Sequence, residues 1–262
     1  MKPDYKNWMP KGMVRSFIAG AAVCAVILLL LVFTGIVPAG TLKTVLVILA
    51  AVLTAVFLGM AVWSVLMYRA FDYNGKRQMS RQIIDGVAKH VRLPHGGKCL
   101  DVGCGSGALT IAVARRNPEA SVIGIDRWGK EYASFSKTLC ENNARVEGVR
   151  NTEFRRGDAT HLDFPDEYFD AVTSNYVYHN IPGDRQAYVL ETLRTLKKGG
   201  SFAIHDIMSV SKYGDIHAFV QKLEDMGFRE VKLINTTSGL FMKKSEAAWM
   251  GLSGSALLIG KK

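Results

Sequence analysis

Two long uncharged stretches near the start of the chain constrain its architecture most. Residues 16–37 and 44–67 contain no charged side chain, and each stretch exceeds the ~20 residues that a helix needs to cross ~30 Å of hydrocarbon. Both are apolar on all sides, unlike a helix that lies along a membrane surface. The residues between them, 38–43, include Pro38 and Gly40 and suit a short turn. The sequence therefore predicts a hairpin of two transmembrane helices within a membrane anchor of residues 1–69.

The charges that flank the two stretches predict their orientation. Basic residues cluster before the first stretch and after the second, whereas the turn contains only Lys43. The clustered residues are Lys2, Lys6, Lys11 and Arg15, and then Arg69, Lys76, Arg77 and Arg81. Because basic residues concentrate on the cytoplasmic side of spanning helices, we expect an integral membrane protein with both termini in the cytoplasm. A cleaved signal peptide is the alternative for the first stretch, but a second spanning stretch directly after it disfavours secretion.

The net charge of +10 is partly explained by the anchor. Residues 1–70 contain six basic residues and one acid, which leaves 27 basic and 22 acidic residues in the rest of the chain. No basic run is interleaved with aromatic residues, so the sequence does not indicate a nucleic-acid partner. The four cysteines form no CxxC pair and no Cys/His spacing suits zinc, so we expect reduced thiols and no metal.

Predicted strands and helices alternate in the rest of the chain, residues 70–262. Strands are expected at 98–102, 121–126, 152–156, 169–174, 201–205, 228–236 and 255–260. Helices are expected at 79–91 and 108–116, from the second strand to about residue 143, after Asp184, and along 216–226. This alternation is typical of a mostly parallel sheet with helices on both faces. The prediction is an α/β fold, a doubly wound, Rossmann-like sheet of seven strands.

The first predicted strand runs into a glycine-rich loop, Asp101-Val102-Gly103-Cys104-Gly105-Ser106-Gly107. In open α/β sheets, ligands bind beyond the carboxyl ends of the strands, and glycines let the backbone approach a ligand closely. The loop and Ala108 also satisfy the dinucleotide pattern G-x-G-x-x-A. Asp126, some twenty residues further on, suits the ribose of either kind of cofactor.

Asp101 helps to separate the two kinds of cofactor. A carboxylate beside the ligand would repel a pyrophosphate, but it would attract the ammonium group of a methionine moiety. The alternative is that Asp101 only hydrogen-bonds within the loop.

Between about Lys98 and Ala203 the chain resembles the class I S-adenosylmethionine-dependent methyltransferases, especially the small-molecule group that includes quinone methyltransferases. Five motifs in order carry the resemblance. They are the loop 101–107, Asp126, Gly157-Asp158-Ala159, the segment Phe169–Asn180 with its Val177-Tyr178-His179-Asn180, and Leu196-Lys197-Lys198-Gly199-Gly200, where Lys198 replaces the usual proline.

The resemblance implies a set of cofactor contacts. The glycine loop and Asp101 would hold the methionine portion, and Asp126 would accept hydrogen bonds from the ribose hydroxyls. Asp158 and the Ala159 amide would bind adenine, while Trp128 would pack either on adenine or in the core. Asn175 would line the pocket near the sulfonium. The predicted cofactor-binding set is Asp101, Gly103, Cys104, Gly105, Gly107, Asp126, Arg127, Trp128, Asp158, Ala159 and Asn175.

His179 and Tyr176 are the candidate catalytic residues. Methyl transfer from a sulfonium depends mainly on alignment of the reacting atoms, and a base matters when the acceptor carries a proton. For His179 three roles stay open: general base, substrate positioning and structural hydrogen bonding. Tyr178, His205 and Asp206 lie at the same predicted strand ends.

The predicted function is a membrane-anchored methyltransferase that uses S-adenosylmethionine and a small, amphipathic or lipid-soluble acceptor. The anchor motivates this acceptor class, because a tethered enzyme can take its substrate from the membrane. Residues 73–84 lack the signatures of menaquinone and ubiquinone methyltransferases, which disfavours a quinone. The alternatives are a membrane-bound NAD(P)-dependent oxidoreductase, which leaves Asp158 and Asn175 unexplained, and a non-catalytic cofactor-binding scaffold.

Overall fold

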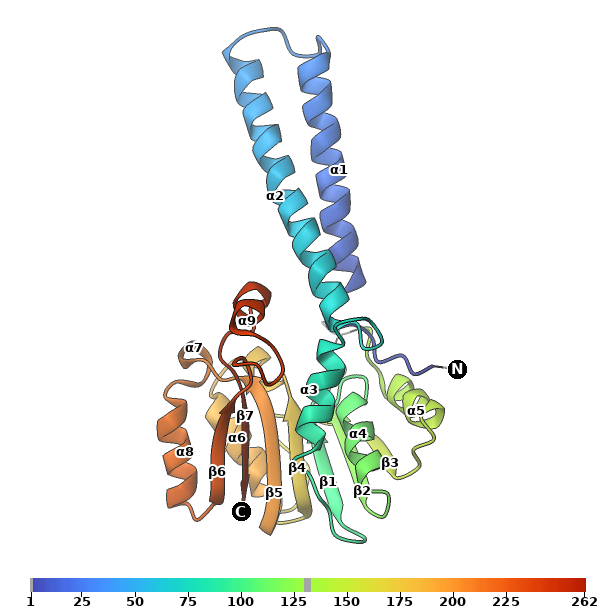
Figure 1. Cartoon of the computed structure of the whole chain (residues 1–262), viewed down its shortest axis with the longest axis vertical. Helices are drawn as coiled ribbons and strands as arrows, with labels where there is room; N and C mark the ends of the chain where they lie inside the picture. Colours follow the sequence, from blue (N-terminus) through green and yellow to red (C-terminus); the bar gives the residue numbers. More distant parts are fainter. Residues whose placement is uncertain (1, 130–132) are drawn as a thin grey trace. The chain divides into compact units, whose positions relative to one another are not determined.

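The computed structural model describes residues 2–129 and 133–262 of the chain (Figure 1). Contacts divide the chain into two compact units. One unit is Asn7–Ser80, and the other joins the residues up to Lys6 with Arg81–Lys262. The division predicted from the sequence, 1–69 and 70–262, stays a prediction. The contacts add that the first residues of the chain pack with the α/β unit.

Two apolar helices, α1 (Lys11–Phe33) and α2 (Thr41–Phe71), make up most of the smaller unit. Both are long and apolar enough to cross a membrane, with mean hydropathies of 2.8 and 2.9, a property shared with signal sequences. They pack closely, since a Cβ on Gly20 would lie 2.6 Å from the Phe57 ring.

The bounds of these helices differ from the predicted 16–37 and 44–67. The first helix ends at Phe33, where the Thr34 hydroxyl bonds the Leu30 carbonyl at 2.6 Å and the chain becomes extended. The second continues to Phe71, beyond the end of the apolar run. Hydropathy locates an uncharged run, but it does not locate the turn of the backbone.

The α/β unit contains a sheet of seven strands in the order β3-β2-β1-β4-β5-β7-β6. The strands are β1 (Lys98–Val102), β2 (Ser121–Asp126), β3 (Thr152–Arg156), β4 (Phe169–Asn175), β5 (Leu196–Ile207), β6 (Arg229–Asn235) and β7 (Ser255–Lys261). All neighbours are parallel except β7, which runs antiparallel to β5 and β6. The predicted doubly wound, mostly parallel sheet is confirmed.

The helices of this unit lie on both faces of the sheet (Figure 1). They are α3 (Met79–Ala88), α4 (Ala108–Arg116), α5 (Lys137–Val146), α6 (Arg185–Arg194), α7 (Val210–Tyr213), α8 (Ile216–Asp225) and α9 (Lys244–Met250), with a 3-10 helix η2 at Tyr178–Asn180. Asp184 caps α6 as expected. The predicted helix before residue 143 begins only at Lys137, where Ser136 caps it. The short helices α7 and α9 were not predicted.

Alternation along β1 sets what each face of the sheet contacts. Leu100 and Val102 join the main core cluster, to which α6 and α8 contribute Leu193 and Phe219. Successive side chains of a strand point to opposite faces, so Asp101 lies on the face covered by α4. The order of strands reverses between β1 and β4, and this is where open α/β sheets bind ligands.

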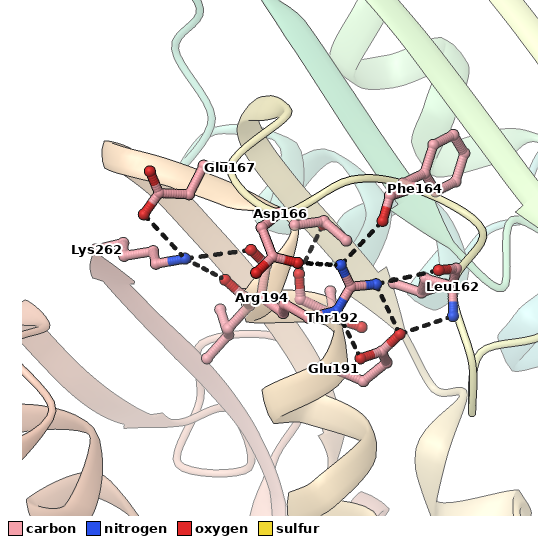
Figure 2. A network of polar contacts seen from close by, with 10 residues as sticks. Leu162, Phe164, Asp166, Glu167, Glu191, Thr192, Arg194 and Lys262 are labelled. Carbon is pink, nitrogen blue, oxygen red and sulfur yellow. Dashed lines mark hydrogen bonds and ion pairs between the residues drawn. The ribbon is translucent and has the colours of Figure 1, made fainter.

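Arg194, at the end of α6, holds the connection that follows β3 (Figure 2). Its guanidinium makes two 2.9 Å hydrogen bonds to the Glu191 carboxylate and also bonds Asp166. It donates to the main-chain carbonyls of Leu162 at 3.1 Å and Phe164 at 2.9 Å. The pKa of Arg194 is raised by these carboxylates, so the guanidinium stays charged. This network fixes the segment that begins at Asp158.

Replacement of Arg194 by Met should destabilise the α/β unit, because the half-buried Glu191 and two carbonyls lose their charged donor. We expect a loss of about 2 kcal/mol in the free energy of unfolding, which lowers the midpoint of thermal unfolding by roughly 4–8 °C. Arg194→Lys keeps the positive charge but lacks the planar guanidinium, so its free energy of unfolding should lie between those of the unchanged protein and Arg194→Met. Circular dichroism of the full-length protein in nanodiscs measures this, and an unchanged midpoint for Arg194→Met would contradict the assignment.

Candidate functional site

The glycine loop Gly103–Gly107 connects β1 to α4 and forms the centre of the candidate site. Gly103, Gly105 and Gly107 all have positive φ, at 72°, 55° and 83°. A Cβ on Gly103 would lie 2.2 Å from the Val177 side chain. Glycine is therefore required at Gly103 both by its left-handed backbone and by this packing. The contact also brings the loop beside the segment that follows β4, where His179 lies.

Asp126, at the end of β2, holds the loop. One carboxylate oxygen accepts the Gly105 amide at 2.8 Å, and the other accepts the Trp128 amide at 2.7 Å. The Trp128 indole N–H donates to the Gly105 carbonyl at 2.9 Å. The predicted residues Gly105, Asp126 and Trp128 thus form one hydrogen-bonded group. Arg127 between them is exposed, while Cys104 is buried and the pKa of its thiol is raised by burial.

Asp101 lies behind the loop with only 1% of its surface exposed. Its carboxylate accepts the hydroxyls of Thr110 from α4 at 2.6 Å and Thr173 from β4 at 2.9 Å. Burial raises the pKa of Asp101 to about 7, against the opposing effect of the two hydroxyls. A neighbouring cation would therefore be strongly stabilising, since it would favour the charged form of a desolvated acid.

Asp158 lies at the neighbouring strand end, just after β3. The Gly157 amide donates to the Asp126 main-chain carbonyl at 3.1 Å, which places this turn beside Asp126. Asp158 is exposed, and one carboxylate oxygen accepts both the amide and the hydroxyl of Thr160. These bonds lower the pKa of Asp158, so its carboxylate is charged. Ala159 beside it packs against the core cluster.

His179 is paired with Asp206 from the end of β5. The His179 ring nitrogen Nδ1 bonds the Asp206 carboxylate, and the His179 amide donates to the same carboxylate at 3.0 Å. Asp206 is fully buried and also accepts the Tyr213 hydroxyl at 2.7 Å and the Ile207 amide at 2.8 Å. An acid held in this way orients the imidazole and fixes Nδ1 as the donor, which leaves Nε2 as the acceptor.

Tyr176 lies in a separate hydrogen-bond chain. The Ser255 hydroxyl donates to the Leu252 carbonyl, so the Tyr176 hydroxyl donates to Ser255 at 2.9 Å. Burial raises the pKa of the Tyr176 phenol above its ordinary value. A buried donor of this kind is not suited to accept a proton, so the geometry favours His179 over Tyr176 as a base.

Asn175 lies on the neighbouring strand position to His205, and the two side chains bond at 2.8 Å. Burial lowers the pKa of His205 to about 3, so the ring is neutral. The Asn175 atom in this bond is the amide oxygen Oδ1, which only accepts, so His205 Nδ1 carries the ring proton. Nε2 of the neutral ring is then an acceptor and lies 3.0 Å from the Thr236 hydroxyl.

Asn143 of α5 joins the loop to the first residues of the chain. Its oxygen accepts the Asp4 amide at 2.7 Å, and its nitrogen donates at 3.0 Å to the carbonyls of both Asp4 and Ser106. Asn143 is only 2% exposed, and both its amide N–H groups and its oxygen are hydrogen-bonded. The sequence interpretation missed Asn143, Thr110 and Thr173. No local motif indicates them, because their partners are remote in the chain.

Residues 100–204 match the model of a methyltransferase domain family. This part of the chain is a methyltransferase domain. It is 34% identical over 117 residues to a demethylmenaquinone methyltransferase of Lactobacillus johnsonii, a match that covers 44% of this chain and 46% of that protein. It is 31% identical over 121 residues to an arsenite methyltransferase of Halobacterium salinarum, covering 46% of this chain and 29% of that protein. The chain thus spans less than half the length of these relatives.

Solved structures support the fold of the methyltransferase domain. The cyclase SpnF superposes with a TM-score of 0.55 at 21% identity, covering 73% of this chain and 85% of that chain. A geranyl diphosphate methyltransferase in complex with GPP and sinefungin gives 0.55 at 16% identity, covering 74% and 82%. At this identity the likeness concerns the fold alone, and a cyclase shares it.

Asn143→Ala should weaken cofactor binding, because the glycine loop loses the bond at Ser106. One neutral hydrogen bond contributes about 0.5–1.5 kcal/mol, so we expect S-adenosylhomocysteine to bind about 2–10-fold more weakly. Asn142→Ala is the matched control, since Asn142 is exposed and bonds only the neighbouring Arg145 among the described residues. Isothermal titration calorimetry compares the two variants. Equal affinities would show that the loop does not depend on Asn143.

Proposed function

We propose that this protein transfers the methyl group of S-adenosylmethionine to a small, lipid-soluble acceptor at a membrane. The observation that carries the proposal is the arrangement at the carboxyl edge of the sheet. There the glycine loop, which Asp126 holds at Gly105, packs at Gly103 against Val177, and His179 of the His179–Asp206 pair follows two residues later. The family match at residues 100–204 agrees with it. The nicotinamide alternative would leave Asp158 and the segment around Asn175 without a role.

The cofactor contacts proposed here use hydrogen-bond capacity that the described residues leave open. Each Asp126 oxygen accepts one backbone amide, and a carboxylate oxygen can accept two hydrogen bonds. Asp126 can therefore hold the loop and also accept the ribose hydroxyls. Asp158 uses one oxygen for Thr160, and no described residue bonds the other, which suits the adenine amine. Asp101 would stabilise the ammonium of the methionine portion by charge across the loop.

S-adenosylmethionine supplies an activated methyl group on a positively charged sulfur. The protein's task is to align the acceptor with that methyl and to exclude water. His179 Nε2 is the group placed to take a proton from the acceptor, because the buried Asp206 holds Nδ1 and stabilises the imidazolium that forms. Asp206 is a positioning residue, held by Tyr213 and by two main-chain amides.

The acceptor class rests on the apolar helices and on the relatives. Helices α1 and α2 suit membrane spans by length and composition, and most of their large apolar side chains are exposed. Burial of such surface in lipid is strongly favourable. We propose insertion with both termini cytoplasmic, as the flanking charges favour. The demethylmenaquinone relatives support a lipid-soluble acceptor, although the arsenite methyltransferase shows that identity of this size does not decide the acceptor.

Transfer of an isotopically labelled methyl group tests the proposal. The full-length protein, incubated with labelled S-adenosylmethionine and a total membrane-lipid extract, should label a lipid-soluble product detectable by mass spectrometry. His179→Ala should reduce labelling while S-adenosylhomocysteine binds with nearly unchanged affinity. Asp126→Ala should weaken that binding at least tenfold, because charged hydrogen bonds contribute about 1.5–3 kcal/mol each.

Two outcomes would refute parts of this account. If the protein binds the cofactor but labels no product in any lipid or soluble extract, the proposal of methyl transfer is refuted. The fold, which a cyclase shares, would then be the part of the account that stands. Equal losses of affinity in His179→Ala and Asp126→Ala would show that His179 lies on the cofactor side.

A further inference from the structure

The methyltransferase domain exposes large apolar side chains in an uneven way. Among the described residues from 81 to 262, the exposed large hydrophobic residues are Val210, Met226, Leu240 and Trp249, with 78%, 56%, 54% and 43% of their surface accessible. Val210 lies in α7, directly after β5. Leu240 and Trp249 lie in the connection from β6 to β7, which contains α9. Only Met226, at the end of α8, lies elsewhere.

Val210, Leu240 and Trp249 lie in connections at one edge of the sheet. Strands β5 and β6 are parallel to each other, because both run antiparallel to β7. The connections after β5 and β6 therefore leave from the same edge, the carboxyl edge that also holds the glycine loop (Figure 1). The Met208 amide donates to the Gly254 carbonyl at 2.9 Å, which joins the two connections. We call Val210, Leu240 and Trp249, with Lys212 and Lys244, the lipid face.

The lipid face has the composition of a membrane interface. Lys212 and Lys244 form no ion pair with the described residues. Apolar side chains, a tryptophan and unpaired lysines together are typical of a surface that enters the boundary of an anionic bilayer. A protein partner fits this composition less well, because lysine is depleted at protein–protein interfaces.

The connection that carries the face also forms a wall of the candidate site. Next to the exposed Leu240, Phe241 and Met242 are buried, at 6% and 1%. The Phe241 ring lies 5.4 Å from the His205 ring, centroid to centroid, and a Cβ on Gly86 would lie 2.2 Å from it. His205 bonds Asn175, which we place near the reacting sulfur. Leu240 is thus exposed at the surface, while the next residue, Phe241, packs against the side of the site where we place the acceptor.

We propose that the lipid face inserts into the surface of an anionic bilayer, so that the acceptor passes from lipid to the site without entering water. This inference rests on the proposed function, because it supplies the route for a lipid-soluble acceptor. It adds a second, peripheral membrane contact to that of the helices α1 and α2.

Photo-crosslinking to lipid tests the inference with a control inside the chain. A diazirine-bearing amino acid replaces Leu240 in one full-length protein and Met226 in another, since the two are exposed to nearly the same degree. Both proteins are reconstituted into vesicles of phosphatidylcholine and phosphatidylglycerol and irradiated. Lipid adducts should be several-fold more abundant at position 240, and the excess should fall in pure phosphatidylcholine.

Equal yields at the two positions, or adducts to protein at position 240, would overturn the inference. Titration of the same two proteins with S-adenosylhomocysteine separates its failure from that of the proposed function. Cofactor binding with equal lipid yields removes only the lipid face. A lipid excess at position 240 without cofactor binding removes only the methyltransferase assignment.

Discussion

The hydrogen bonds from the Asp126 carboxylate to the amides of Gly105 and Trp128 determine the shape of the candidate site. The glycine loop contains three glycines with left-handed backbone. Glycine loses more conformational entropy on folding than any other residue, so the loop needs contacts that stabilise it. The Asp126 carboxylate, the Trp128 indole and the Asn143 amide fix the loop by hydrogen bonds to its main chain. Residues of β2 and α5 contact this loop directly, so we propose that a cofactor bound at the loop also reaches the neighbouring strand ends.

Asp101 makes the same region sensitive to charge. Its unfolded pKa is near 3.8, and burial raises the folded value to about 7. A raised carboxyl pKa means that the folded state favours the neutral acid. Stability is therefore fully present at low pH and decreases as the pH rises from about 4 to about 7. We propose that a bound ammonium group reverses this by stabilising the carboxylate, which would couple ligand binding to proton release at this site.

The sequence predicted the elements that local patterns determine and missed those that depend on remote contacts. Strands β1, β2 and β3 lie at the predicted positions, where each strand ends in an acid or is followed by a glycine. The helix before residue 143 was predicted to start too early, since Ser136 and the positive φ of Trp128 interrupt it. Helix α1 ends at Phe33 and α2 continues to Phe71, bounds that differ from the ends of the two uncharged runs.

The candidate site shows the same division. Asp101, Asp126 and Asp158 were identified because motifs place acids at strand ends, and the structure brings the last two together through Gly157. Whether each contacts the cofactor stays a prediction. His179 pairs with Asp206, which lies 27 positions further along the chain. The Tyr176 hydroxyl bonds Ser255, which lies 79 positions further along. Spacing along the chain does not contain that information.

Calorimetric titration of the full-length protein with S-adenosylhomocysteine and, separately, with NADH tests the central claim most directly. The titration is done near pH 7 in two buffers that differ in ionisation enthalpy, with Asp101→Asn as the comparison. We expect S-adenosylhomocysteine to bind with a buffer-dependent heat that reports proton release, and Asp101→Asn to lose that dependence. NADH should give no binding heat. Tight binding of NADH without binding of S-adenosylhomocysteine would contradict the account.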